Sequence, residues 1–285
     1  MGEWRINPRE NLQDVLDVAP PGTVIRLPAG EIRQKVTIRT PNITLIGAGP
    51  GRSRIVFDDC ARDMDNLGRP LGTFRSFTLA VTAEQVTLRD LSVINDRGDP
   101  ARNGQQVALS VCGGGFNMEN CGLASTQDTL FLGPLPPDLR LRYRDLLPWE
   151  LRRGEPLFAR FANCRIVGSV DFIFGGGRAL LEGCEILSVY DGRNIGYVAA
   201  PSHDGDQAEG FTFRRCRFTA EPEVAPGSVY LARPWRDHGL AVFEDCAYGP
   251  HIHPAGFDKW GTTDRDKTAR FYEKPPVPGR VAWVR

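Results

Sequence analysis

Residues 211–218 read FTFRRCRF, and this short stretch carries the pattern that decides the fold of the chain. Apolar side chains alternate with other residues at Phe211 and Phe213, two polar residues follow, and the alternation resumes at Cys216 and Phe218. A period of two predicts short β-strands, and the polar pair between them predicts a tight bend. The stretch therefore predicts two short strands joined by a bend.

The same pattern recurs elsewhere, at residues 86–93, 116–123, 159–166, 181–186 and 241–248. Its Cys or Leu position is offset by 30, 43, 20, 32 and 30 residues along the series Leu91, Cys121, Cys164, Cys184, Cys216 and Cys246. A minimum near 20 with variable additions is typical of a solenoid whose coils stack while the extra residues form side loops. We therefore predict an all-β fold, a single-stranded right-handed parallel β-helix.

The seven cysteines are an odd number, and none belongs to a C-x-x-C pair. A disulfide framework or a zinc site is therefore poorly supported. Free cysteine is often buried and behaves as a small apolar residue. We expect the repeated cysteines to stack as a buried ladder of thiols.

We expect residues 1–285 to form a single domain whose N-terminal end is capped. Leu12, Val15 and Leu16 share one helical face, and two prolines follow. A solenoid needs its open end covered, so a short helix within about residues 8–22 is the expected cap.

Two further segments depart from the repeat. The proline-rich and charged segment of about 134–156 accounts for the 43-residue offset, and we expect it to be a surface insertion. The polar, proline-containing tail of about 262–285 is expected to pack along the outside.

The charge balance of the chain limits the kinds of molecule that it is expected to bind. Lys and Arg together number 35, as do Asp and Glu, so the net charge is zero. We therefore expect no nucleic-acid or membrane partner, and we expect a monomer. No apolar run approaches the roughly 20 residues of a membrane span, and the first residues lack the layout of a secretory signal. If Met1 is the native start, a cytoplasmic location is expected; the alternative is a secreted protein whose signal has been removed.

Four stretches place polar groups where their neighbours predict strands: QQVALSV at 105–111, STQDTLFLG at 125–133, SVDFIFGGG at 169–177 and YLARPWRDHG at 230–239. A lone ionised carboxylate such as that of Asp171 is costly to bury, so it needs a partner. Taken singly, each stretch also fits a turn or an internal hydrogen-bond ladder, and a buried Asp–Arg pair is commonly structural.

Together the four stretches resemble the signature segments of the pectin methylesterases (pectinesterases), in the order of that family. The family's Q-A-V-A-L, Q-D-T-L, G-T-V-D-F-I-F-G and L-G-R-P-W match residues 105–109, 127–130, 168–175 and 231–235. VAAPS at 198–202 and HIHPAGFDKWG at 251–261 look like the bacterial branch. The resemblance spans about residues 25–261 and also implies a right-handed β-helix.

The resemblance implies a role for each matching residue. Asp171 would be the nucleophile, Asp128 the general acid and then base, Gln105 and Gln127 the oxyanion donors, and Arg233 the partner of the nucleophile. Trp235, Thr73 and Trp260 are expected to contact the sugar. The implied substrate is the methyl ester of galacturonate units in methylated homogalacturonan or its oligosaccharides, with methanol released. No metal and no cofactor is expected.

The chemistry requires these residue types. Two adjacent carboxyls push their pKa values apart, because both cannot ionise cheaply. A guanidinium fork from Arg233 would keep Asp171 ionised, and Asp128 would then retain its proton. The side-chain amides are neutral donors suited to a developing oxyanion. Since stacked coils lie about 4.8 Å apart, residues distant in sequence can share one face.

The chain departs from the family pattern at three places. Gly30-Glu31-Ile32-Arg33-Gln34 stands for the family's G-x-Y-x-E, Ser125-Thr126 stands where an aromatic often precedes Q-D-T, and Ala232 replaces a glycine. None removes a proposed catalytic group. The missing aromatics argue against intact, highly methylated pectin, and an insertion able to cap the groove favours short oligosaccharides. Because no signal peptide is visible, the hypothesis is an intracellular enzyme that acts on imported methylated oligogalacturonates.

Other functions remain open at this point: a β-helix polysaccharide lyase or glycosidase, a non-catalytic carbohydrate-binding solenoid, and an acyl-CoA thioesterase. A lyase would need a calcium-binding carboxylate cluster, and an inverting hydrolase two acids with water between them. The chain has no G-x-S-x-G elbow. His251 and His253 alternate as metal ligands can, but nothing at a recognisable spacing completes the site.

Overall fold

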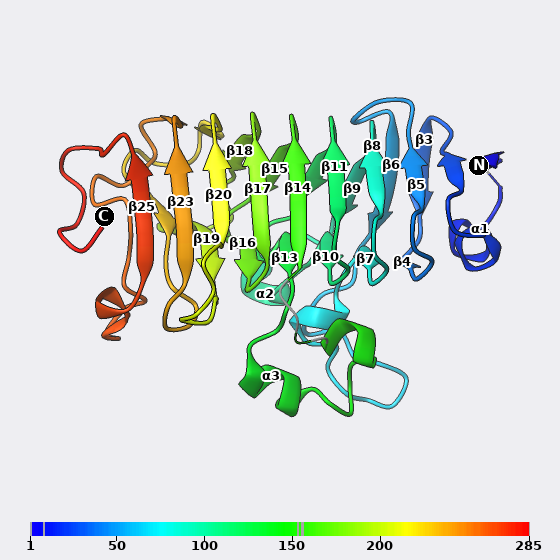
Figure 1. Cartoon of the computed structure of the whole chain (residues 1–285), viewed down its shortest axis with the longest axis horizontal. Coiled ribbons are helices and arrows are strands. Elements are labelled where there is room, and N and C mark those ends of the chain that lie inside the picture. The colour runs from blue at the N-terminus through cyan, green and yellow to red at the C-terminus, as the bar shows by residue number, and fades with distance from the viewer. Residues whose placement is uncertain (1, 8, 153, 155–156, 285) are drawn as a thin grey trace.

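The computed structural model describes residues 2–7, 9–152, 154 and 157–284. Within them the chain winds into an elongated stack of coils built from three parallel sheets (Figure 1). The sheets are visited in the same order in coil after coil; for example, β14, β15 and β16 belong to the first, second and third sheet, and β17 returns to the first. The predicted parallel β-helix is confirmed.

The first sheet has ten strands in spatial order: β1 (Glu3–Arg5), β2 (Val24–Arg26), β5 (Thr44–Ile46), β8 (Thr87–Arg89), β11 (Phe116–Glu119), β14 (Phe158–Ala162), β17 (Arg178–Glu182), β20 (Phe211–Arg214), β23 (Leu240–Glu244) and β25 (Arg270–Lys274). The second sheet has eight: β3 (Gly30–Arg33), β6 (Ser53–Phe57), β9 (Ser92–Asn95), β12 (Gly122–Ala124), β15 (Arg165–Gly168), β18 (Glu185–Ser188), β21 (Arg217–Ala220) and β24 (Ala247–Tyr248). The third has seven: β4 (Val36–Ile38), β7 (Leu79–Val81), β10 (Leu109–Val111), β13 (Leu130–Leu132), β16 (Val170–Gly175), β19 (Gly196–Pro201) and β22 (Val229–Ala232).

Each sequence repeat contains a strand of the first sheet, a bend and a strand of the second sheet. The residue just before the Cys or Leu position turns the bend, and it has a left-handed φ of 49° at Asn120, 53° at Asn163, 62° at Gly183 and 53° at Asp245. Gly, Asn and Asp adopt this conformation more readily than other residues. Gly, Asn or Asp therefore suits most of these bends, and Arg215 adopts the same conformation, with a φ of 51°, before Cys216.

The cysteines that follow these bends form a ladder of free thiols, buried except for the partly exposed Cys246. Each thiol donates toward backbone carbonyls near the bend. Cys164 Sγ lies 3.5 Å from the oxygen of Met118 on the preceding coil and 3.3 Å from that of Ala162 on its own. The thiols thus fill core positions beside the bends and have carbonyl partners in the adjoining strands, so the predicted structural role is confirmed.

The N-terminal end of the stack carries α1 (Leu12–Val18), as predicted (Figure 1). Asn11 caps the helix, its side chain accepting from the amides of Gln13 and Asp14. Leu12 and Leu16 are buried in the core. The Leu12 amide donates to Gln34 Oε1 at 2.8 Å, which attaches the helix to the first coil.

The remaining helices are short and lie outside the coils. They are α2 (Pro100–Asn103), α3 (Pro137–Arg142) and the 3₁₀ turns η1 (Thr73–Arg75), η2 (Trp149–Arg152) and η3 (Arg265–Lys267). The predicted insertion contains α3 and η2 and projects from one side of the stack (Figure 1). Its residues 153, 155 and 156 lie outside the described residues.

The C-terminal tail differs from expectation. Residues 270–274 form β25, which pairs with β23 and extends the first sheet, rather than packing along the outside. Phe271 is fully buried and Glu273 nearly so. The alternation of Phe271 with polar neighbours makes one more strand, and the polar composition of the tail concealed it.

Candidate active site

The third sheet positions the residues of the candidate site, because its strands stack in register. Leu130, Ile173, Ala199 and Ala232 are successive partners in β13, β16, β19 and β22. The polar groups singled out in the sequence lie beside this row. Asp128 precedes β13, Asp171 lies in β16, and Arg233 follows β22.

Asp171 sits at an irregularity of β16. Val170 pairs with Tyr197 and Ile173 with Ala199, so two residues of β16 lie opposite the single residue Val198. Asp171 has a φ of 50° there, which Asp tolerates better than most residues. The bulge allows a charged side chain within a strand whose residues are all buried.

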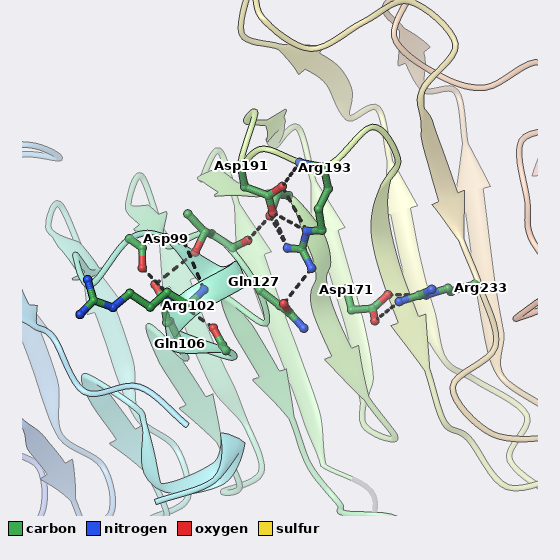
Figure 2. A network of polar contacts seen from close by, with 12 residues as sticks. Asp99, Arg102, Gln106, Gln127, Asp171, Asp191, Arg193 and Arg233 are labelled. Atoms are coloured by element: carbon green, nitrogen blue, oxygen red, sulfur yellow. Dashed lines mark hydrogen bonds and ion pairs between the residues drawn. The ribbon is translucent and has the colours of Figure 1, made fainter. Parts of the chain in front are cut away.

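The charge of Asp171 is held by Arg233, as predicted. Arg233 Nε donates to Asp171 Oδ1 at 2.8 Å and Nη2 to Oδ2 at 2.6 Å (Figure 2). This two-bond fork is the strongest common pairing of a carboxylate with a cation. Arg233 is therefore the partner that the buried carboxylate within SVDFIFGGG needs.

Two aromatic rings hold Arg233. Its guanidinium carbon lies 3.7 Å from the ring centroid of Tyr197 and 4.1 Å from that of Trp260. Tyr197 in turn stacks on Tyr230. Cation–π contacts of this kind are worth about 0.5–2 kcal/mol, the upper end applying where water is excluded. The guanidinium fork thus faces Asp171 in a fixed position.

The two carboxyls differ in electrostatic environment although both are buried, Asp128 being 8% and Asp171 9% exposed. Burial, and next the charge of Asp171, raise the pKa of Asp128 well above its usual value. Burial also raises the pKa of Asp171, but the hydrogen bonds and charge of Arg233 oppose that rise. Asp128 is therefore the acid that retains its proton, and Asp171 the one that ionises first.

All eight residues selected from the sequence line one cleft of about 440 Å³. They are Thr73, Gln105, Gln127, Asp128, Asp171, Arg233, Trp235 and Trp260. Phe74 and Phe174 pack against the Trp235 ring, with centroids 6.5 and 5.8 Å away. The cleft therefore combines acids, amides and a cation with aromatic rings.

Comparison with known proteins identifies the family. The model of the Pectinesterase family matches residues 8–135 and 157–280. The chain belongs to the pectinesterase family. This membership places it among the carboxylic ester hydrolases.

Pectinesterase 31 of Arabidopsis thaliana is 30% identical over 292 residues, covering 96% of this chain and 83% of that protein. Other plant relatives are longer; the chain spans 37% of pectinesterase 3 of Citrus sinensis. A pectin methylesterase from carrot has a TM-score of 0.81 at 25% identity, covering 97% of this chain and 83% of that one. A pectin methylesterase in complex with a hexasaccharide has a TM-score of 0.77 at 24% identity, covering 95% and 87%.

The family model passes over residues 136–156, which fall within the predicted insertion. This part of the pectinesterase chain nevertheless reaches the cleft, where Leu139, Arg142 and Tyr143 form a wall. Asp138 of α3 pairs with Arg236, beside Trp235, at 2.8 Å. The insertion is thus attached to the coils next to the predicted site.

Sequence reasoning missed two side chains near the predicted catalytic groups. Tyr197 directly precedes the VAAPS stretch, so its position beside a recognised segment was a usable signal. Arg193 lies in the loop before β19 and donates to Gln127 Oε1 at 2.9 Å (Figure 2). Nothing periodic in its neighbourhood indicated this contact.

Other features of the pectinesterase chain do not compete with this cleft. A groove of about 580 Å³ lies over the first sheet, but Glu209, the one carboxylate among its described lining residues, is paired with Arg178. Among the described residues, no three His, Cys, Asp or Glu side chains are grouped to hold a metal. His253 stacks on Tyr230 at 4.2 Å between ring centroids. No helix in the described part is long and apolar enough to cross a membrane.

Proposed function

We propose that this pectinesterase hydrolyses the methyl esters of galacturonate units in methylated homogalacturonan or its oligosaccharides and releases methanol. One observation carries the proposal: the anion of Asp171, forked by Arg233, and the raised-pKa carboxyl of Asp128 line the same cleft. An ionised nucleophile beside a protonated acid is what attack on an ester at mild pH requires.

In the first half of the reaction, a carboxylate oxygen of Asp171 attacks the ester carbonyl carbon. The carbonyl oxygen becomes an oxyanion, which the amide N–H groups of Gln105 and Gln127 stabilise. As the tetrahedral intermediate collapses, the C–O bond to the methoxy group breaks and Asp128 gives its proton to departing methanol. The product is an anhydride between Asp171 and the galacturonate carboxyl.

In the second half, water attacks the galacturonyl carbon of the anhydride. Asp128, now a carboxylate, accepts the proton of that water, so it ends the cycle protonated as it began. Cleavage of the anhydride restores the carboxylate of Asp171. The fork from Arg233 favours this anion as the leaving group.

The sugar would lie against the aromatic part of the cleft. Trp235 offers a ring there, and Thr73 also lines the cleft. Trp260 has one role besides sugar contact, since its ring also lies against the guanidinium of Arg233. We propose that these three residues orient the methylated unit over Asp171.

The insertion leads us to propose short oligosaccharides as the preferred substrates. It walls the cleft with Leu139, Arg142 and Tyr143 and is held there by the Asp138–Arg236 pair. A relative of the same fold is known in complex with a hexasaccharide. A chain of about six sugars is therefore a sensible upper size for the first assays.

Methanol release from methylated galacturonans of graded length tests the proposal. We expect turnover by the wild type on trimers to hexamers and none by Asp171→Asn. Activity on the long polymer with none on hexamers would contradict the size preference. No methanol from any substrate would contradict the esterase function and favour a non-catalytic solenoid.

A further inference from the structure

The orientation of the Gln127 side chain is set by a group outside the predicted catalytic residues. Arg193 Nη1 donates to Gln127 Oε1, so the amide oxygen faces Arg193 and the amide nitrogen is turned away (Figure 2). A guanidinium has five donors and no acceptor. The contact therefore tolerates only one of the two orientations of the amide, because the flipped one would bring donor against donor.

Arg193 is itself firmly held. Its Nε lies 3.1 and 3.0 Å from the two carboxylate oxygens of Asp191, whose side chain is only 2% exposed. Burial raises the pKa of Asp191, but hydrogen bonds from Arg193 and Ser169 outweigh it and leave the pKa lowered. Asp191 therefore stays ionised at mild pH and keeps the guanidinium in place.

The support extends into the neighbouring coils. Ser169 Oγ donates to Asp191 and lies 3.0 Å from the carbonyl oxygen of Thr126. The Thr126 hydroxyl donates to Gln106 Oε1 at 3.1 Å. Thr126 and Ser169 are positions where this chain differs from the family pattern, which has an aromatic before Q-D-T and a threonine in G-T-V-D. Two members of the network, Thr126 and Ser169, thus stand at positions where the chain departs from the family pattern.

We propose that Arg193 is a positioning residue that fixes the Gln127 amide with its N–H groups toward the cleft, where the oxyanion forms. The inference rests on the proposed function. Without Arg193 the amide can take either orientation, and the flipped one would present its oxygen to a negatively charged intermediate. The hydrogen bond from Gln127 that opposes the raised pKa of Asp128 fits the same orientation.

A double-mutant cycle tests the proposal. In the wild-type background we expect Arg193→Gln to lower kcat about 10- to 100-fold, somewhat less than the 10²–10³ typical of deleting an oxyanion donor, with KM changed less than about 2-fold. In a Gln127→Ala background the same substitution should change kcat less than about 2-fold, since no amide remains to be positioned. Equal losses in both backgrounds would overturn the inference.

Matched variants separate positioning from general damage. Arg193→Lys keeps a cationic donor group and should lose less activity than Arg193→Gln, and it replaces that variant if Arg193→Gln fails to fold. Arg160→Gln removes an arginine that pairs with Glu182 on the first sheet, away from the cleft, and should leave kcat unchanged.

A readout independent of turnover distinguishes this inference from the proposed function. The side-chain amide resonances of Gln127 can be identified by their loss in Gln127→Ala. They should shift in Arg193→Gln while the backbone spectrum elsewhere is retained. Unchanged Gln127 resonances would overturn the positioning role even if the wild type is an active esterase, whereas a shift without any methanol release would leave the positioning contact and remove the esterase.

Discussion

The guanidinium of Arg233 lies 3.7 Å from the ring centroid of Tyr197 while it forks the carboxylate of Asp171. The two residues come from β19 and from the turn after β22, neighbouring coils of the third sheet. The ring restrains the cation laterally, and the carboxylate uses the two donors that face it. A residue without any reacting atom thus controls how the proposed nucleophile is charged.

Replacing Tyr197 should therefore weaken catalysis through Arg233. We expect Tyr197→Leu to lower kcat/KM by about 2- to 30-fold, as the loss of about 0.5–2 kcal/mol of cation–π attraction implies. Because Arg233 holds down the pKa of Asp171 against burial, a looser fork should raise that pKa and shift the acidic limb of the pH profile upward. Tyr197→Phe keeps the ring and is the control; an equal shift in it would contradict this explanation.

Replacing each of the two carboxyls by an amide should change stability in opposite directions. Folded Asp128 binds its proton more tightly than the unfolded chain does, because its pKa is raised. Its contribution to stability is therefore fully present below the usual carboxyl pKa and is lost as the pH rises toward the raised value. Asp128→Asn removes this loss, so the variant should be inactive yet more stable than wild type near pH 8, by about 1.4 kcal/mol for each unit of pKa shift.

Asp171→Asn is the matched comparison. It leaves the guanidinium of Arg233 in a largely buried site without its anion, which typically costs about 3 kcal/mol or more. Urea unfolding of both variants near pH 8 and near pH 4 measures the difference. A destabilised Asp128→Asn at the higher pH would show that its carboxyl is ionised and paired there.

The sequence predicted the coils because their pattern repeats, and the matching motifs selected residues that the structure brings into one cleft. Every coil of the solenoid needs the same bend, so Cys164 and Cys216 mark equivalent places in space. The stacking of coils then brings Asp128, Asp171 and Arg233 together without further information.

Residues outside this repetition could not be predicted in the same way. Arg193 reaches Gln127 from a loop whose course depends on the loop length and on the contact with Asp191. Neither of these belongs to the repeating pattern of the coils. The strand of residues 270–274 was missed because its polar neighbours outnumber Phe271. Both the Arg193–Gln127 contact and the last strand depend on tertiary contacts, which a local sequence pattern does not predict.

The pair between Asp138 and Arg236 makes the insertion testable. Asp138 is 59% exposed, so breaking the pair should change the free energy of unfolding by less than about 1 kcal/mol. Its removal should nevertheless free the wall of the cleft, and we expect Asp138→Ala to raise KM for a methylated hexamer several-fold with kcat nearly unchanged. Asp145→Ala, which removes the exposed partner of Arg144 within the same insertion, is the control. A fall in kcat alone would contradict a purely substrate-holding role for the insertion.

The buried thiols of the cysteine ladder should be unreactive in the folded protein. Desolvation is the main cause that raises the pKa of Cys121 to about 12, and hydrogen bonding to Cys164 contributes most to the same rise at Cys184. Neither therefore forms the reactive thiolate at neutral pH.

A thiol-specific disulfide reagent should leave Cys121 and Cys184 unmodified and the activity intact, whereas all seven cysteines should react after unfolding in guanidinium chloride. Cys184→Ala deletes a thiol that lies 3.6 Å from the carbonyl oxygens of both Phe161 and Glu182, so it should cost about 1–2 kcal/mol of stability. Since this thiol faces the core rather than the cleft, kcat should not change; inactivation by the reagent before unfolding would mean that one of these thiols serves the site.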